Sequence, residues 1–106
     1  MSLFRRKVGW VLADVVARHA AAPETFRVPS EDAVAALQVG DRVKLVVEPS
    51  TGLAERMWVV VTAVGDEELE GTLASDPAEL RVLRAGDAVQ FERRHVAAIS
   101  RRSAGP

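Results

Sequence analysis

The sequence contains no cysteine and no tyrosine, and it has only two histidines. Without cysteine, a disulfide framework, a thiolate metal site, a redox motif and a cysteine nucleophile are all excluded. His19 and His95 lack the helical spacing of a zinc site, and together they supply little acid–base chemistry. The glycine-rich phosphate motifs G-x-G-x-x-G and G-x-x-x-x-G-K do not occur. We therefore predict no metal, no cofactor, no catalytic residue and no enzymatic activity.

Long hydrophobic runs are also missing. The most apolar stretch near the start, Val8–Val16, is interrupted by Asp14 and is shorter than the roughly 20 residues that a membrane span needs. The basic segment Met1–Lys7 before it gives the layout of a secretory signal as a second interpretation. We predict a cytoplasmic protein without a membrane span. Its 106 residues, of which 48% are hydrophobic, suit one small globular domain.

Residues 1–23 are predicted to form an N-terminal amphipathic helix, with its helical part over Leu3–Ala21. Apolar side chains and one histidine recur there at steps of three and four and define one stripe: Phe4, Val8, Val11, Leu12, Val15 and His19. Pro23 ends the helix. We expect this helix to pack on the domain, with docking on a membrane surface or on a partner as the alternative.

Residues 24–100 are predicted to form a single antiparallel-sheet domain, and residues 101–106 a flexible tail. A short helix is expected at 31–37, with Ser30 as its N-cap. Alternating or continuous apolar patterns predict strands at Arg42–Glu48, Glu55–Val64, Leu69–Ala74 and Asp87–Glu92, and a last short element near Val96 and Ile99. Because Met57–Val61 is wholly apolar, we expect the second of these strands to be covered on both sides.

One pattern occurs twice, at Leu37–Val43 and at Leu83–Val89, as L-x-x-G-D-x-V. The glycine can take the positive φ that turns a chain into a strand, and the aspartate can bond local backbone N–H groups. Short antiparallel strands with tight turns indicate an α+β fold. We predict that the N-terminal helix packs on a small, strongly bent antiparallel sheet, for which an SH3-like barrel is one closed form.

The charge is unevenly distributed along the chain. Residues 1–29 carry a net charge of +3, residues 30–92 carry five bases against thirteen acids, and residues 93–106 carry +4. The acidic middle repels phosphate at long range, which argues against nucleic acid as a partner of the sheet. A nucleic-acid-binding small barrel that uses its basic termini is the alternative, through residues such as Arg5, Arg6, Arg93, Arg94, Arg101 and Arg102.

The most informative candidate for a binding site is the start of the apolar strand. Glu55 and Arg56 precede Met57 and Trp58 there. If the Trp58 side of the strand is open, that indole becomes an anchor for a partner protein. The competing interpretation is that Trp58 fills the space beneath the N-terminal helix. The predicted protein-binding patch consists of Trp58 and Met57, rimmed by Glu55, Arg56 and Asp76.

His95 is the remaining polar candidate, and we interpret it as a structural, hydrogen-bonding histidine. An alternative function, small-molecule binding or hydrolysis, requires a pocket that joins His95 to a carboxylate such as Asp76 or Glu55.

Several blocks of the chain, taken together and in order, resemble the small bacterial domain of unknown function family 2314. These blocks are Thr25–Ser30, Leu37–Leu45, Glu55–Thr62, Gly71–Pro77, Leu83–Phe91 and His95-Val96. The resemblance spans residues 25–99. It implies no catalytic residue, and it implies protein binding only through the family's association with bacterial immunity and accessory proteins. We therefore expect a non-enzymatic, protein-binding domain of accessory or immunity type, whose partner and oligomeric state the sequence leaves open.

Overall fold

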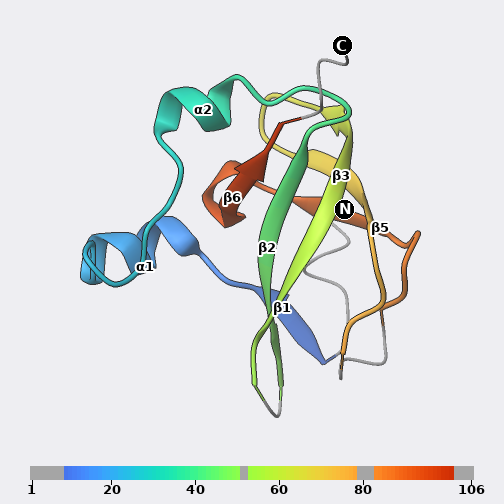
Figure 1. Cartoon of the computed structure of the whole chain (residues 1–106), viewed down its shortest axis with the longest axis horizontal. Helices are drawn as coiled ribbons and strands as arrows, with labels where there is room; N and C mark the ends of the chain where they lie inside the picture. The colour runs from blue at the N-terminus through green and yellow to red at the C-terminus, as the bar shows by residue number, and fades with distance from the viewer. Residues whose placement is uncertain (1–8, 51–52, 79–82, 102–106) are drawn as a thin grey trace.

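The computed structural model describes residues 9–50, 53–78 and 83–101 (Figure 1). Within these ranges, two short helices and six strands follow one another, and a 3₁₀ turn precedes the last strand. In order they are β1 (Trp10–Leu12), α1 (Val15–Ala21), α2 (Glu31–Ala35), β2 (Arg42–Pro49), β3 (Glu55–Val64), β4 (Leu69–Leu73), β5 (Ala88–Phe91), η2 (Arg93–His95) and β6 (Val96–Ser100). The predicted α+β class is confirmed.

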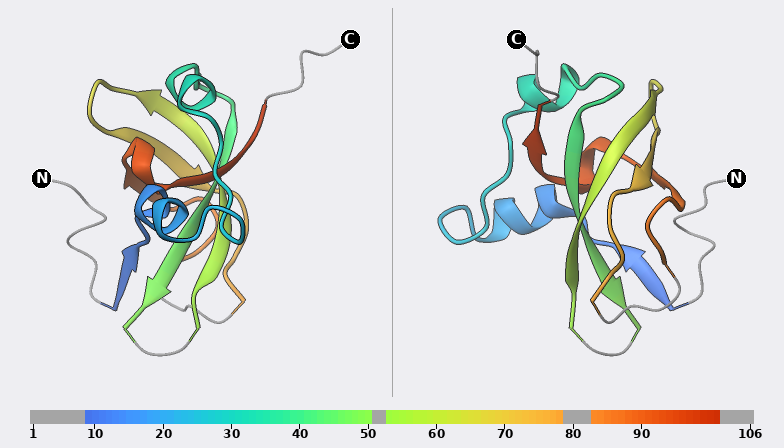
Figure 2. Two further views of the ribbon diagram at one scale, coloured as in Figure 1. Left: turned by 90° about the vertical axis from the view of Figure 1, so that its left-hand side faces the viewer. Right: turned by 45° about the vertical axis from the view of Figure 1, so that its right-hand side comes forward.

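The six strands form one antiparallel sheet in the order β1-β2-β3-β4-β5, and β6 joins it by pairing with β2. Strand β2 organises the sheet because β3 covers one edge, while β6 and β1 share the other edge. β6 pairs with the first half of β2, as far as Leu45, and β1 pairs with its end, Val47–Pro49. The sheet curls into a half-barrel, with the helices on one side (Figure 2). Among the described residues, β1 and β5 do not pair with each other, so the path stays open.

The main hydrophobic core fills the inside of this half-barrel. Strands β2 and β3 each send alternate side chains into it, for example Val43 and Leu45 from β2 and Val59 and Val61 from β3. Phe91 of β5 is fully buried against them. The sequence predicted this period of two for Arg42–Glu48, and it predicted a strand for Glu55–Val64 from a continuous apolar run; both strands are confirmed.

The expectation that β3 is covered on both sides is wrong. Met57, Val59 and Val61 are buried, but Trp58 and Val60 between them are only half-buried. A second, smaller cluster lies on the outer side of the sheet, where Val46 packs with Ala13, Val15 and Ala97. This cluster covers part of β2 and leaves the outer side of β3 open.

The predicted helix over Leu3–Ala21 is wrong in its middle part. Trp10–Leu12 forms strand β1, and the helix begins only at Val15; residues 1–8 lie outside the described part of the chain. Trp10 and Leu12 point into the core while Val11 is exposed, a strand alternation that the helical stripe concealed. Asp14, which interrupts the apolar stretch, is the N-cap of α1 and accepts a hydrogen bond from the Ala17 backbone N–H at 3.0 Å.

The second short helix is present but ends earlier than predicted, at Ala35. Ser30 is its N-cap, as expected, and accepts from the Ala33 backbone N–H at 3.1 Å. Strands β4, β5 and β6 lie within one or two residues of their predicted positions. Residues 102–106 of the predicted tail lie outside the described part of the chain.

The two L-x-x-G-D-x-V segments, Leu37–Val43 and Leu83–Val89, fold alike, and we call them the twin turns. In each, the aspartate (Asp41 or Asp87) accepts a side-chain hydrogen bond at 2.9 Å from the backbone N–H three residues earlier. The preceding glycines have φ values of 98° and 91°, which residues with a Cβ rarely adopt.

Each twin turn is also attached to a neighbouring strand by a pair of backbone hydrogen bonds. The glycine N–H donates to a strand carbonyl, and the N–H of that same strand residue donates back to the aspartate carbonyl. The strand residue is Val61 of β3 for the first turn and Leu73 of β4 for the second. The repeated sequence pattern therefore encodes one local structure, used at two sites of the sheet.

Candidate functional site

The outer side of the β2–β3 ladder carries the most distinctive group of exposed side chains. Arg42 and Lys44 of β2 point outward between the buried residues of that strand, and Arg56 and Trp58 do so from β3. The register places Lys44 directly opposite Trp58. Because side chains opposite each other on an antiparallel pair lie about 5 Å apart at Cβ, these four side chains form one surface.

Two aromatic rings on this surface each carry a cation over one face. The Lys44 Nζ lies 4.9 Å from the centroid of the Trp58 ring. The Arg56 Cζ lies 5.7 Å from the centroid of Phe26, which belongs to the connector between α1 and α2 and packs on the outer cluster. Both distances are within the range of a cation–π attraction. We call the surface formed by Arg42, Lys44, Arg56, Trp58 and Phe26 the basic–aromatic face.

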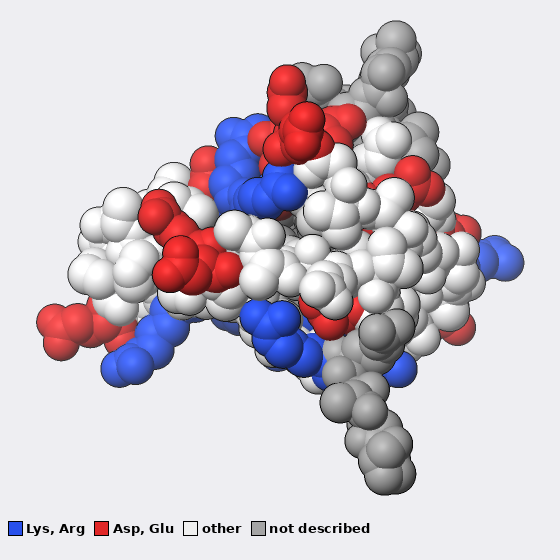
Figure 3. All heavy atoms as spheres, turned by 90° about the horizontal axis from the view of Figure 1, so that it is seen from above, with Lys and Arg blue, Asp and Glu red and all other residues white. Residues whose placement is uncertain are grey.

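The three bases of this face have no carboxylate partner within residues 9–50, 53–78 and 83–101. Among the other bases of the same part of the chain, Arg18 pairs with Glu48, Arg94 with two acids and Arg101 with Asp41. Arg27, Arg84 and Arg93 resemble the bases of the face in having no carboxylate partner among the described residues. Seen from above, basic groups lie along the lower margin of the molecule, and a further basic group lies beside the acidic atoms at the upper margin (Figure 3). Acidic atoms are present at both margins in this view.

The structure separates the residues of the predicted patch. Trp58 and Arg56 lie on the basic–aromatic face, and the half-buried Trp58 belongs to neither cluster of buried residues. Met57 points the other way and is 5% exposed in the main core, so it is not part of an accessible patch. Glu55 is opposite the core residue Val47, and one of its carboxylate oxygens is buried.

Asp76 lies in the loop after β4, where its Oδ1 accepts a hydrogen bond at 2.9 Å from the Ala85 backbone N–H. Its contact therefore holds two loop segments together near the second twin turn. The rim that the sequence predicted for the patch is replaced by residues from β2 and from the connector.

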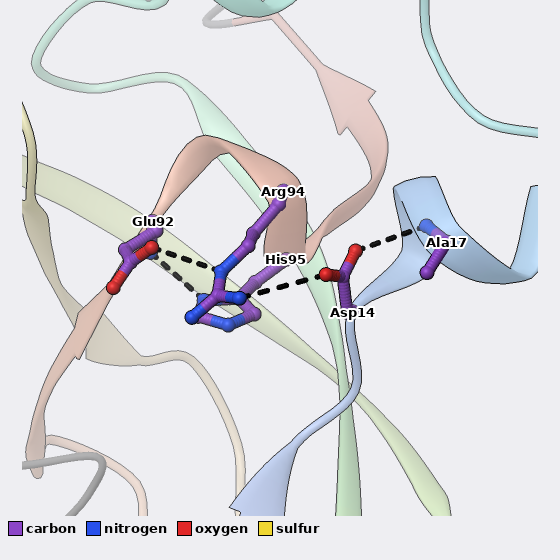
Figure 4. A network of polar contacts seen from close by, with 5 residues as sticks. All are labelled: Asp14, Ala17, Glu92, Arg94 and His95. Carbon is purple, nitrogen blue, oxygen red and sulfur yellow. Dashed lines mark hydrogen bonds and ion pairs between the residues drawn. The ribbon is translucent and has the colours of Figure 1, made fainter.

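His95 lies in a polar network between the η2 turn and the start of α1 (Figure 4). It is 2% exposed, and its Nδ1 accepts a hydrogen bond at 2.9 Å from the Glu92 backbone N–H. Burial, reinforced by the neighbouring Arg94 guanidinium, lowers the pKa of His95 from 6.5 to about 4, although Glu92 and Asp14 oppose this shift. At neutral pH the ring is uncharged and fixes the η2 turn.

Arg94 connects this network to α1. Its Nε is 2.9 Å from a Glu92 carboxylate oxygen, and one Nη is 3.5 Å from the Asp14 carboxylate at the start of the helix. Figure 4 shows the guanidinium between these two acids. The carboxylates beside His95 are thus Glu92 and Asp14, and not the Asp76 or Glu55 of the sequence-based alternative. This arrangement positions α1 on η2.

A groove of about 480 Å³ lies between α1, the connector, α2 and η2. Its wall is largely apolar, with Val16, Val28 and Val34 among the lining residues. The two arginines that line it are engaged elsewhere: Arg94 binds two carboxylates, and Arg93 donates to the carbonyl oxygens of Asp66 and Gly65 at 2.8 and 2.9 Å. The other polar residues that line it are His19, whose Nδ1 lies 2.7 Å from the Phe26 carbonyl oxygen, Ser30, which caps α2, and Glu31 in the first turn of α2.

Sequence reasoning missed Arg42, Lys44 and Phe26. The alternation of Arg42-Val43-Lys44-Leu45 was available as a signal that both bases point away from the core. Phe26 carried no comparable signal, because its position beside Arg56 depends on where the connector crosses the sheet. No helix within the described residues has the length and apolar character to span a membrane.

The fold and these surfaces define a small α+β half-barrel domain with an open outer face. The sequence profile of the domain of unknown function family 2314, described as an uncharacterized protein conserved in bacteria, matches residues 20–99. The chain belongs to this family, and the resemblance noted over residues 25–99 is confirmed. No curated protein and no solved structure matches the chain.

Proposed function

We propose that this domain acts by binding another protein through the basic–aromatic face, with Trp58 as the central anchor, and that it performs no catalysis. The finer form of this proposal is a cytoplasmic accessory or immunity protein of bacteria. The observation that carries it is the position of Trp58. This large aromatic residue lies within β3 but is a member of neither hydrophobic cluster.

A half-buried tryptophan on an uncovered sheet face gains little stability for the domain itself. Burial of its remaining apolar surface against a partner would contribute hydrophobic free energy to binding. Tryptophan and arginine are accordingly enriched among the interface residues that dominate affinity. Trp58 and Arg56 supply both residue types within one strand. The neighbouring Phe26 enlarges the apolar part of the surface.

The absence of catalysis is supported by the state of His95. Its ring is neutral at pH 7, buried, and engaged with the Glu92 backbone N–H, so it is arranged to hold a turn and not to exchange protons with a substrate. Its sequence neighbours Arg94 and Val96 line the nearby groove, where Arg94 is paired with two carboxylates and Val96 is buried.

The experiment compares proteins captured from a native bacterial lysate by the immobilised full chain and by Trp58→Ala. Leu53→Ala is the matched control, because Leu53 is 85% exposed and lies outside the face. We expect the wild type and Leu53→Ala to retain a common protein that Trp58→Ala, verified as folded by its melting curve, loses. Retention of every partner by folded Trp58→Ala would refute the proposal.

A further inference from the structure

We infer that the partner presents an acidic, extended segment to the basic–aromatic face; this inference rests on the proposed function and specifies its ligand. The face needs an occupant that neutralises three positive charges and contributes apolar atoms to Trp58. A polypeptide in which carboxylates alternate with small or apolar side chains has this chemistry.

The first argument is charge complementarity. Residues 30–92 carry thirteen acids and only five bases, yet Arg42, Lys44 and Arg56, three of those five, share one surface. None of the three has a carboxylate partner among the described residues, although acids are abundant in the chain. Like charges gathered on one surface repel one another, and an anionic partner relieves that repulsion.

The second argument is spacing. Arg42 and Lys44 are two residues apart on one strand, which separates them by roughly 6.7 Å along β2. An extended peptide repeats its own same-side residues at the same interval. A carboxylate at every second position can therefore reach successive bases, and the methylene groups of those acidic side chains supply the apolar atoms that contact Trp58.

The third argument is accessibility. The neighbours of Lys44 and Arg42 across the β2–β6 pairing are Ala98 and Ser100, two small residues that leave the surface low around the bases. The outward-pointing acid of the same strand is Glu48, and it is already paired with Arg18. On the β6 side of Lys44, an incoming carboxylate thus meets neither a bulky side chain of the paired strand nor an unpaired acid of β2.

Nucleic acid fits the face less well. Single strands of nucleic acid bind on successive aromatic rings with which their bases stack, and strands β2 and β3 contribute one ring to this face, Trp58. The surplus of acids elsewhere in the sheet domain, including Asp66 and Glu67 on the β3–β4 turn, also repels a long polyanion.

The test measures binding of a fluorescent peptide of about a dozen residues in which glutamate alternates with valine, by anisotropy at low and high salt. The comparison peptide has glutamine in place of every glutamate. We expect the glutamate peptide to bind the full chain more tightly than the glutamine peptide, and to weaken as salt rises. Lys44→Gln and Arg56→Gln should each lower its affinity by roughly two- to five-fold.

The control variant is Arg84→Gln, which removes an exposed base outside the face and should leave the affinity unchanged. Absence of binding at low salt, or equal binding of both peptides, would overturn the inference. If the peptides bind equally but Trp58→Ala still loses its captured partner, the proposed function stands and only the acidic ligand is wrong. Tighter binding of an oligodeoxythymidine strand that depends on Lys44 and Arg56 would also overturn it and assign the face to nucleic acid.

Discussion

The two faces of the β2–β3 ladder differ sharply although they alternate residue by residue along the same strands. Inward, Val43, Leu45 and Val59 are at most 1% exposed and belong to the main core. Outward, Lys44 and Trp58 face each other across the same register and are half-buried. Strand β3 is therefore stabilised mainly from its inner side, while the outer cluster covers Val46 of β2.

The comparison also explains why stability and binding can be tested separately in this domain. Changes on the inner face remove buried contacts and are expected to act on the free energy of unfolding. Changes on the outer face remove solvated groups, whose contributions to that free energy are small.

The largest expected difference in stability between the two faces is at the consecutive residues Met57 and Trp58. Met57→Ala leaves a cavity in the main core and should lower the free energy of unfolding by about 2–5 kcal/mol. Trp58→Ala removes a cross-strand and cation–π contact on the outer face and should cost about 1 kcal/mol. Urea unfolding of both variants measures the difference, and an equal loss from both would contradict the one-sided core.

The next effect is a loss of folding stability at low pH. Because the pKa of His95 is about 4 in the folded chain and 6.5 in the unfolded chain, the unfolded state binds the proton first as pH falls. Stability from this group is complete above pH 6.5 and is lost toward pH 4, by about 3 kcal/mol.

His95→Asn tests this acid sensitivity, since an amide oxygen can still accept from the Glu92 backbone N–H but does not titrate in this range. The readout is the difference in unfolding free energy between the two proteins across pH 6.5 to 4. A difference that stays constant with pH would show that His95 does not resist protonation in the fold.

A smaller effect is expected where β3 and β4 approach each other on the inner side. Gly71 is buried opposite Val61, and a Cβ at this position would meet the Val59 side chain and lie 2.6 Å from the Val60 carbonyl oxygen. Gly71→Ala should therefore destabilise the domain by about 1–3 kcal/mol through overpacking. The control is Ala98→Gly on the outer side of β6, which should cost about 1 kcal/mol or less. Gly65→Ala is unsuitable as a control, because a Cβ there would meet the Glu68 carbonyl oxygen. Thermal melting that ranks the two variants in the opposite order would contradict this account.

The smallest effect compares the twin turns, which share their turn hydrogen bonds but differ in burial and in the ion pair between Asp41 and Arg101. Asp41 is 5% exposed, while Asp87 is half-buried. Asp41→Ala leaves a backbone N–H of a more enclosed turn without its acceptor and should cost about 1–2 kcal/mol; Asp87→Ala should cost less than half of that, because water can replace its carboxylate. Equal losses in chemical denaturation would show that the local turn, and not its burial, sets the cost.

Much of the sheet was predictable because it depends on local patterns. The period of two in β2, the Ser30 cap and the twin glycine–aspartate turns are each encoded within a few residues, and each is present as predicted. The candidate site was predictable only in part. Trp58 and Arg56 belong to it, whereas Met57 is in the core and Asp76 holds a loop.

The sequence by itself determined the strands, the turns and the family of this chain, since these follow from side-chain alternation, backbone preferences and motif order. Only the tertiary structure decided that Trp10–Leu12 is a strand, because its backbone pairs with the end of β2, far along the chain. The same holds for the basic–aromatic face, which unites Phe26 from the connector with Lys44 from β2 and Arg56 from β3. Local sequence sets which way a side chain points along its own strand, but the neighbours it meets are fixed by pairing between distant segments.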